Sequence, residues 1–168
     1  MSEPHYSLQP VHLDALYYLS ICNRYSDTPI AVTEYLCITK GTASQTINVL
    51  VRKNLVRKTD DIHDKRKVHL ELTAEGQRIV DTMTPPKLFK EALESLDKET
   101  QARLSQDLKI LILALQSANQ RKSFGACKSC RYNQRLESPQ YMCMLTKEML
   151  SAEDTEKICR EHEAPRPA

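Results

Sequence analysis

The sequence predicts a mainly α-helical protein that carries one small β-hairpin and ends in a small metal-binding segment. Three observations support this. Apolar residues recur at helical spacing over most of residues 11–54 and 73–116, two short stretches of alternating or β-branched residues flank a charged turn within residues 55–72, and four cysteines follow residue 121. At 168 residues, the chain has room for one ordinary domain and a small appendage.

The composition is that of a folded soluble protein, with 40% apolar and 27% charged residues. No apolar run approaches the ~20 residues needed to cross a bilayer, and the N-terminus lacks the features of a secretory signal. We therefore expect a cytoplasmic protein without a membrane span. In that reducing compartment, closely spaced cysteines bind metal or do redox chemistry more often than they form disulfides. Cys22 and Cys37 lie in helical, largely apolar contexts and are expected to fill the core.

Three helices are expected before the hairpin. The first covers Val11 to Asn23 and stops before Pro29, the second covers Ile30 to Ile38, and Thr39 caps a third that runs to about Asn54. The third helix has an apolar face that must point to the core, made by Ala43, Ile47, Leu50 and Val51. Its outward stripe is Ser44, Gln45, Asn48 and Arg52.

That outward stripe is suited to DNA. Ser44, Gln45 and Asn48 are residue types that hydrogen-bond base edges in a major groove, and Arg52 and Lys40 are placed for phosphates. A plain solvated helix face would be the better interpretation if this helix stood alone. The hairpin that follows favours the DNA-binding interpretation.

The hairpin is predicted from two strands, Leu55 to Thr59 and Lys67 to Leu72, around the charged turn Asp60 to Arg66. Helix, turn, helix and hairpin together form a winged helix. The tip carries the basic residues His63, Lys65, Arg66 and Lys67. Such a tip can reach an adjacent minor groove or phosphates. Between Lys40 and Leu72 there are eight Lys or Arg against four acids, which indicates a face for a polyanion.

The stretch Val32 to Val80 resembles the winged helix of MarR-family transcriptional regulators. The motifs that carry the resemblance are Leu55-Val56-Arg57-Lys58, Asp64-Lys65-Arg66 and Leu72-Thr73-Ala74-Glu75-Gly76, and the match extends over roughly residues 8 to 116. The resemblance implies that Arg66 enters the minor groove while Asp64 orients it. It also implies that Ser44, Gln45 and Asn48 read the major groove.

Three further helices are expected after the hairpin. Thr73 caps one that runs to about Met83, Pro85 and Pro86 interrupt the chain, and helices follow from Lys87 and over Glu99 to Gln116. The last helix is apolar nearly all round, with Leu104, Leu108, Leu111, Ile112 and Leu115 on one stripe. A second subunit could cover it, which predicts a homodimer on a near-palindromic double-stranded operator. A helix sandwiched inside a monomer is the alternative. The expected divisions are 1–84 for the DNA-binding domain, 85–120 for the dimerisation helices and 121–168 for the cysteine-rich segment.

The cysteine-rich segment contains Cys127, Cys130, Cys143 and Cys159, separated by two, twelve and fifteen residues. Four thiolates can saturate a tetrahedral Zn²⁺ or the four irons of a [4Fe-4S] cluster. The spacing resembles that of high-potential iron-sulfur proteins, as does the aromatic Tyr132 two residues after the second cysteine. This resemblance implies that each cysteine binds one iron, and that Met144, Leu145, Met149 and Ile158 shield the cluster. Zinc stays open as the alternative; His162 could then replace a thiolate, but it is expected at an exposed helix end.

Enzymatic function is not expected. The chain has three glycines, no Gly-rich phosphate loop and no Ser, His and Asp in a recognisable order. A regulator that senses redox or iron-sulfur status through its cluster fits both halves of the chain. A redox protein that uses the cluster for electron transfer is the less favoured alternative.

Overall fold

The computed structural model describes residues 7–62, 64–118, 124–136 and 140–165. The chain divides into two compact units, Met1–Thr82 and Met83–Ala168, and each is described by itself. His63 of the predicted wing tip and residues 121–123 at the start of the cysteine-rich segment lie outside the described residues. Within the described part, none of the helices is both long and apolar enough to cross a bilayer.

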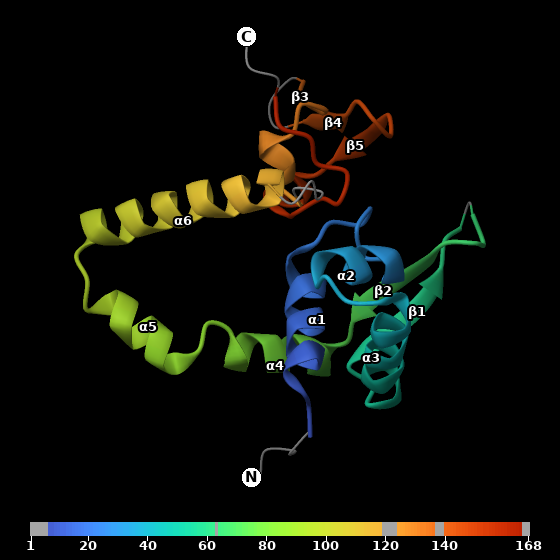
Figure 1. The fold of residues 1–168 in the computed structure, drawn as a ribbon. Coiled ribbons are helices and arrows are strands. Elements are labelled where there is room, and N and C mark those ends of the chain that lie inside the picture. Colours follow the sequence, from blue (N-terminus) through green and yellow to red (C-terminus); the bar gives the residue numbers. More distant parts are fainter. Residues whose placement is uncertain (1–6, 63, 119–123, 137–139, 166–168) are drawn as a thin grey trace. The chain divides into compact units, whose positions relative to one another are not determined.

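The first unit is a winged helix (Figure 1). It contains α1 (Pro10–Ile21), α2 (Pro29–Tyr35), α3 (Lys40–Arg52), the hairpin β1 (Val56–Asp60) and β2 (Val68–Leu72), and α4 (Ala74–Met83). The predicted order of elements is confirmed. The predicted caps are also present: Thr39 accepts a hydrogen bond from the Thr42 amide at 3.1 Å, and Thr73 accepts one from the Gly76 amide at 3.1 Å.

The core of this unit lies between α1, α2, α3 and the hairpin. Its side chains with less than 2% exposure include Leu16, Tyr18, Leu50, Leu55 and Val32. In α3 the predicted inward residues Ala43, Ile47 and Leu50 are buried, whereas Val51 is only half-buried and Thr46 takes its place in the core. The core fixes the rotation of α3, because the helix can bury only one face at a time.

The hairpin pairs antiparallel from Val56 opposite Leu72 to Asp60 opposite Val68. The amide of Thr73 then donates to the carbonyl of Leu55 at 3.0 Å, which holds the start of α4 against the start of β1. Gly76 makes this approach possible, because a Cβ at that position would lie 2.2 Å from the Leu55 oxygen.

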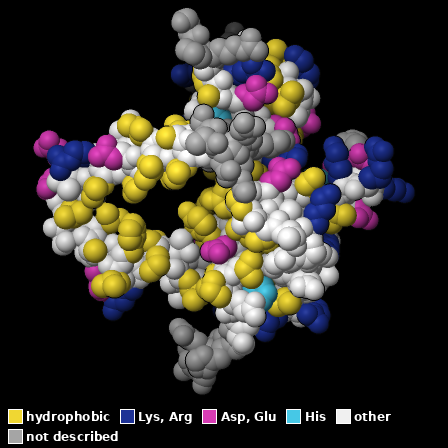
Figure 2. Space-filling model, in the orientation of Figure 1, with side chains coloured by type: hydrophobic (Ala, Val, Ile, Leu, Met, Phe, Trp, Pro, Cys, Tyr) yellow, Lys and Arg dark blue, Asp and Glu magenta, His cyan; other side chains and the backbone are white. Residues whose placement is uncertain are grey.

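Helices α5 (Lys87–Glu94) and α6 (Lys98–Ala118) begin the second unit. Nothing in α5 is buried, and large apolar side chains of α6 from Leu104 to Leu115 are between 42% and 60% exposed. Figure 2 shows hydrophobic side chains gathered along both helices. In a single chain these side chains lack a cover, as the sequence pattern predicted.

The cysteine-rich segment is more regular than the sequence suggested. It contains a 3₁₀ turn (η1, Cys127–Ser129), the antiparallel strands β3 (Asn133–Arg135), β4 (Tyr141–Cys143) and β5 (Glu148–Leu150), and α7 (Ala152–Glu156). The sheet was not predicted, because strands of three residues are too short to show alternation. The helix suggested by the sequence up to His162 ends at Glu156 instead.

Candidate nucleic-acid interface and cysteine cluster

One face of α3 carries the predicted DNA-reading residues. Lys40, Ser44, Gln45, Asn48 and Arg52 are all exposed on the side opposite the buried Ala43, Ile47 and Leu50. The face is polar and free of acidic side chains. It can therefore approach a polyanion and still offer hydrogen-bonding groups to base edges.

The first strand of the hairpin reaches this face. Lys58 donates from Nζ to Oδ1 of Asn48 at 2.9 Å. Because an ammonium group can only donate, the contact fixes the Asn48 amide with its oxygen toward Lys58 and its NH₂ group away from it. Lys58 also lines a pocket of about 340 Å³ together with Lys40 and Ser44. Lys58 thus belongs to the same surface, although sequence reasoning had placed it only in a strand.

The wing tip holds the predicted pair of Asp64 and Arg66. The Arg66 Nε and backbone amide donate to Asp64 Oδ1 at 2.9 and 3.1 Å, and its Nη2 donates to Oδ2 at 3.3 Å. The Arg66 side chain is 90% exposed. Hydrogen bonds from Arg66 lower the pKa of Asp64. Asp64 therefore stays ionised and holds the exposed guanidinium by hydrogen bonds; neighbouring Lys65 is also exposed.

The four cysteines of the second unit lie in one neighbourhood. Burial raises the pKa of the Cys127 thiol, and the charges of Cys159, Cys130 and Cys143 each raise it further. Cys127 and Cys130 sit on either side of one tight turn, where the Cys130 amide donates to the Cys127 carbonyl at 3.0 Å. Cys143 ends β4 opposite Asn133 of β3. Cys159 is attached to the same turn, because its amide donates to the Gly125 carbonyl at 3.0 Å.

Among the described residues, N–H groups of Asn133 and Glu163 donate to two of these sulfurs. The Asn133 Nδ2 donates to Cys127 Sγ at 3.4 Å, and the backbone amide of Glu163 donates to Cys130 Sγ at 3.5 Å. Such bonds stabilise a thiolate, as they do around metal-bound sulfur. All six cysteines of the chain are free thiols. As the side chains stand, no group of three or more His, Cys, Asp or Glu within the described ranges is arranged to hold a metal ion.

His162 differs from its expectation. It was expected to be exposed, yet it is buried at 8% exposure, and its Nε2 lies 3.0 Å from the Ser129 hydroxyl. Burial lowers its pKa, so it is a neutral imidazole packed against Gly125. Cys22 is buried as expected, whereas the expectation for Cys37 was wrong: it is exposed and has a positive φ of 56°, in the turn between α2 and α3.

The family model described as MarR family matches residues 6–67, which contain α1 to α3 and β1. The resemblance seen in the sequence is thereby confirmed for that segment, and a comparison with curated proteins gave no significant match. The resemblance of the four-cysteine spacing to high-potential iron-sulfur proteins found no support and stays a prediction.

Solved structures share the MarR-type fold. Streptococcus pneumoniae FabT in complex with DNA aligns with a TM-score of 0.57 at 22% identity, over 70% of this chain and 82% of FabT. A MarR transcriptional regulator from Methanosarcina mazei Go1 gives 0.57 at 21% identity, over 67% and 81%. The S. aureus MepR–DNA complex gives 0.51 at 22% identity, over 66% and 82%. At these identities the likeness establishes the fold.

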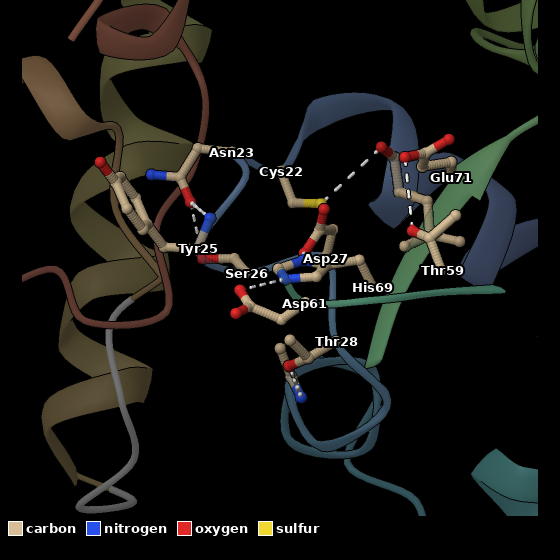
Figure 3. A network of polar contacts seen from close by, with 12 residues as sticks. Cys22, Asn23, Tyr25, Ser26, Asp27, Thr28, Thr59, Asp61, His69 and Glu71 are labelled. Carbon is tan, nitrogen blue, oxygen red and sulfur yellow. Dashed lines mark hydrogen bonds and ion pairs between the residues drawn. The ribbon is translucent and has the colours of Figure 1, made fainter. Parts of the chain in front are cut away.

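The winged-helix unit also contains a polar network that sequence reasoning missed (Figure 3). His69 of β2 places Nδ1 2.6 Å from Asp27 Oδ1 and Nε2 3.0 Å from Asp61 Oδ2. Asp27 lies in the connection between α1 and α2, and Asp61 follows β1. These residues are 42 and 8 positions from His69 in sequence, so no local pattern could have connected them.

Proposed function

We propose that the protein is a dimeric, DNA-binding transcription regulator of the MarR type. The observation that carries this proposal is the combination of an exposed, acid-free reading face on α3 with the Asp64–Arg66 pair at the wing tip. The face suits a major groove, and an arginine held by one carboxylate suits a narrow minor groove beside it. FabT and MepR, which share the fold, have been solved in complex with DNA, and this supports the same partner here.

The dimer is proposed from the uncovered helices of the second unit. In α6, Leu108, Leu111 and Ile112 are each more than half exposed, and α5 adds Leu88 and Phe89. A helix that is apolar on several sides needs a partner, and a second copy offers the same surface in a symmetric contact. The two α3 helices of the dimer, one helical turn of DNA apart, would then bind a near-palindromic site and add their affinities.

The cysteine cluster is proposed to hold a [4Fe-4S] cluster through Cys127, Cys130, Cys143 and Cys159. Support comes from the size of the segment: among its described residues only Phe124, Cys127, Leu150, Thr155 and His162 are buried. So small a core rarely orders a chain alone, and metal or disulfide cross-links usually compensate. Four neighbouring free thiols with N–H donors supply the chemistry for a metal cross-link.

The chain's own residues suggest how such a site would act as a sensor. When bound, a cluster supplies a redox-sensitive cross-link between thiolates. The η1 turn and the residue that follows it carry two of the sulfurs, β4 the third and the segment after α7 the fourth, so losing the cross-link would loosen all three pieces together. The cysteine-rich segment follows α6 in the chain. Whether this segment is folded would bias the spacing of the two α3 helices in the dimer, and hence operator affinity.

A structural Zn²⁺ on the same thiolates is the alternative, and metal content decides between the two. Protein purified without oxygen should contain about four irons per chain and absorb near about 400 nm, as iron-thiolate clusters do. Colourless protein with one zinc per chain would show that the thiolates form a structural zinc site and not a redox sensor. Protein with neither metal after reconstitution would remove the metal proposal and leave the DNA-binding proposal intact.

DNA binding is tested by selection from a pool of randomised duplexes, followed by affinity measurement on the enriched sequence. The expected outcome is an inverted repeat whose half-sites lie about 10 base pairs apart. If the wild-type protein enriches no sequence, the regulator proposal fails. DNA upstream of the protein's own gene is a natural second probe.

A further inference from the structure

The wing is tied to the body of the winged helix through one side chain, His69. Its ring is 22% exposed, and the two carboxyl groups that flank it, Asp27 and Asp61, are 18% and 23% exposed. Figure 3 shows the ring between them. The backbone adds a parallel link, because the Leu70 amide donates to the Asp27 carbonyl at 2.7 Å. The strand that leads back from the wing tip is thus anchored where α1 passes into α2.

Both ring nitrogens of His69 face carboxylate oxygens, at 2.6 and 3.0 Å. An ionised carboxylate can only accept hydrogen bonds, so both nitrogens must carry a proton for both contacts to form. With both carboxylates ionised, the anchored ring is an imidazolium. A neutral imidazole has one donor and would have to give up one of the two carboxylates.

The contact to Asp61 continues toward the tip. The other oxygen of Asp61, Oδ1, accepts the backbone amide of Asp64 at 2.7 Å. Asp64 in turn accepts the backbone amide and the Nε of Arg66 at 3.1 and 2.9 Å. An unbroken set of hydrogen bonds thus joins Asp27 in the body to the guanidinium at the wing tip.

We infer that His69 is the positioning residue of the wing: as an imidazolium held between Asp27 and Asp61, it orders the tip turn that aims Arg66 at DNA. This inference rests on the proposed function. His69 itself touches no DNA in this role, and it acts through Asp61 and Asp64. Operator affinity therefore depends on the protonation of His69, a residue that the DNA does not contact.

The pKa of His69 determines at which pH the wing is anchored. Burial by itself would lower the pKa of His69, but hydrogen bonds to Asp61 and Asp27 and their charges outweigh it, and the pKa lies above its usual 6.5. The folded pKa is raised, so the stabilisation is complete below pH 6.5 and is lost as the pH rises through the folded value. The anchored wing is therefore the low-pH form.

Other ionisable groups around His69 leave this direction unchanged. Burial raises the pKa of Asp27 and the charge of Glu71 adds to that rise, although the bond with His69 opposes it. Glu71 is held by Arg57 across the hairpin at 2.6 Å, and Thr59 donates to it at 3.4 Å. On the α1 side, the buried Tyr18 hydroxyl donates to the Ser26 carbonyl at 2.6 Å, and Cys22 is a buried thiol that donates to the Leu19 carbonyl at 3.7 Å.

The test measures the dissociation constant of the full-length protein for its selected duplex between pH 6 and 9 at constant salt. Wild-type affinity should fall with rising pH. His69→Gln should bind about tenfold more weakly at pH 6, since the loss is bounded by what Arg66 contributes, and its difference from the wild type should shrink as the pH rises through the folded pKa of His69. In an Arg66→Ala background, His69→Gln should change the constant by less than about twofold. His69→Lys, which keeps its charge, should retain affinity at pH 9 better than the wild type.

Two results would overturn the assignment of His69 and leave the proposed function intact. The first is a wild-type pH curve that His69→Gln does not alter. The second is a loss of affinity on His69→Gln that is as large in the Arg66→Ala background as in the wild type. The second would mean that His69 merely supports the domain. If His69→Gln does not fold, Asp61→Asn decides, because its amide still accepts from Asp64 but removes one charge from His69. The midpoint of the pH curve should then move to lower pH, and an unmoved midpoint refutes the inference. A wild-type protein that selects no duplex overturns the proposed function itself.

Discussion

Replacing Gly76 by alanine probes the contact between α4 and the start of the wing. The new Cβ would lie 2.2 Å from the Leu55 oxygen, 3.1 Å from its carbonyl carbon and 3.2 Å from Leu72 Cδ2. The first of these distances is about 1 Å shorter than tolerable contacts, so helix or strand must move. Leu55 is fully buried and its oxygen accepts the Thr73 amide, which leaves little freedom to move.

The expected cost follows from two opposing terms. Overpacking a tight site costs about 1–3 kcal/mol. The upper half of this range applies because the atoms that the new Cβ would meet first belong to the Leu55 backbone. Alanine in place of glycine recovers about 0.4–1 kcal/mol by restricting the unfolded chain. The net loss is about 1.5 kcal/mol, which lowers the Tm of a domain of this size by about 6–12 °C.

Gly41→Ala is the matched control. The same change is made near the start of another helix, but the nearest atom to the new Cβ is Thr39 Oγ1 at 3.8 Å, which is ordinary contact. This variant should gain about 0.5 kcal/mol. Urea unfolding followed by circular dichroism measures both, and hydrogen exchange of α1 and α3 amides assigns the change to this unit. Equal stabilisation by the two alanines would refute the close approach of α4 to Leu55.

The remaining predictions concern function. Arg66→Ala should weaken binding to the selected duplex by about 1–3 kcal/mol in an anisotropy titration, whereas Arg78→Ala, which removes a guanidinium paired to Glu75 on α4, should leave it unchanged; equal losses would contradict the wing assignment. Cys143→Ser should lower the metal content per chain and speed proteolysis of the C-terminal segment, while Cys37→Ser should do neither; unchanged stoichiometry would remove Cys143 from the ligand set. Leu111→Asp should convert the dimer to monomers in light scattering, and Lys109→Asp on the same helix should not; a persistent dimer would place the interface elsewhere.

Local chemistry explains why the first unit could be predicted. Thr39 and Thr73 stop the preceding segment and cap the next helix through bonds three residues away, and such short-range signals are visible in a sequence. The split of α3 into a buried and an exposed face follows from helical geometry, so Ser44, Gln45 and Asn48 were placed correctly on its surface. Their contacts with DNA remain predictions.

The second unit was less predictable, for a physical reason. Strands β3 to β5 have three residues each and are defined by hydrogen bonds between distant backbone groups. The position of His162 depends on Gly125, 37 residues earlier, whose missing Cβ leaves room for the imidazole ring. The sequence therefore revealed the four cysteines and their spacing, but neither the sheet nor the buried histidine.

By itself, then, the sequence determined where the helices of the first unit lie, which face of α3 is polar, where the wing turns and which sulfurs are available, because each depends on neighbours a few positions away. Only the tertiary structure decided that His69 stands between Asp27 and Asp61, that Lys58 reaches Asn48, and that the charges of three cysteines act on Cys127. Side chains this far apart in the chain meet only after the core has fixed the path of the backbone, and no periodicity encodes that path.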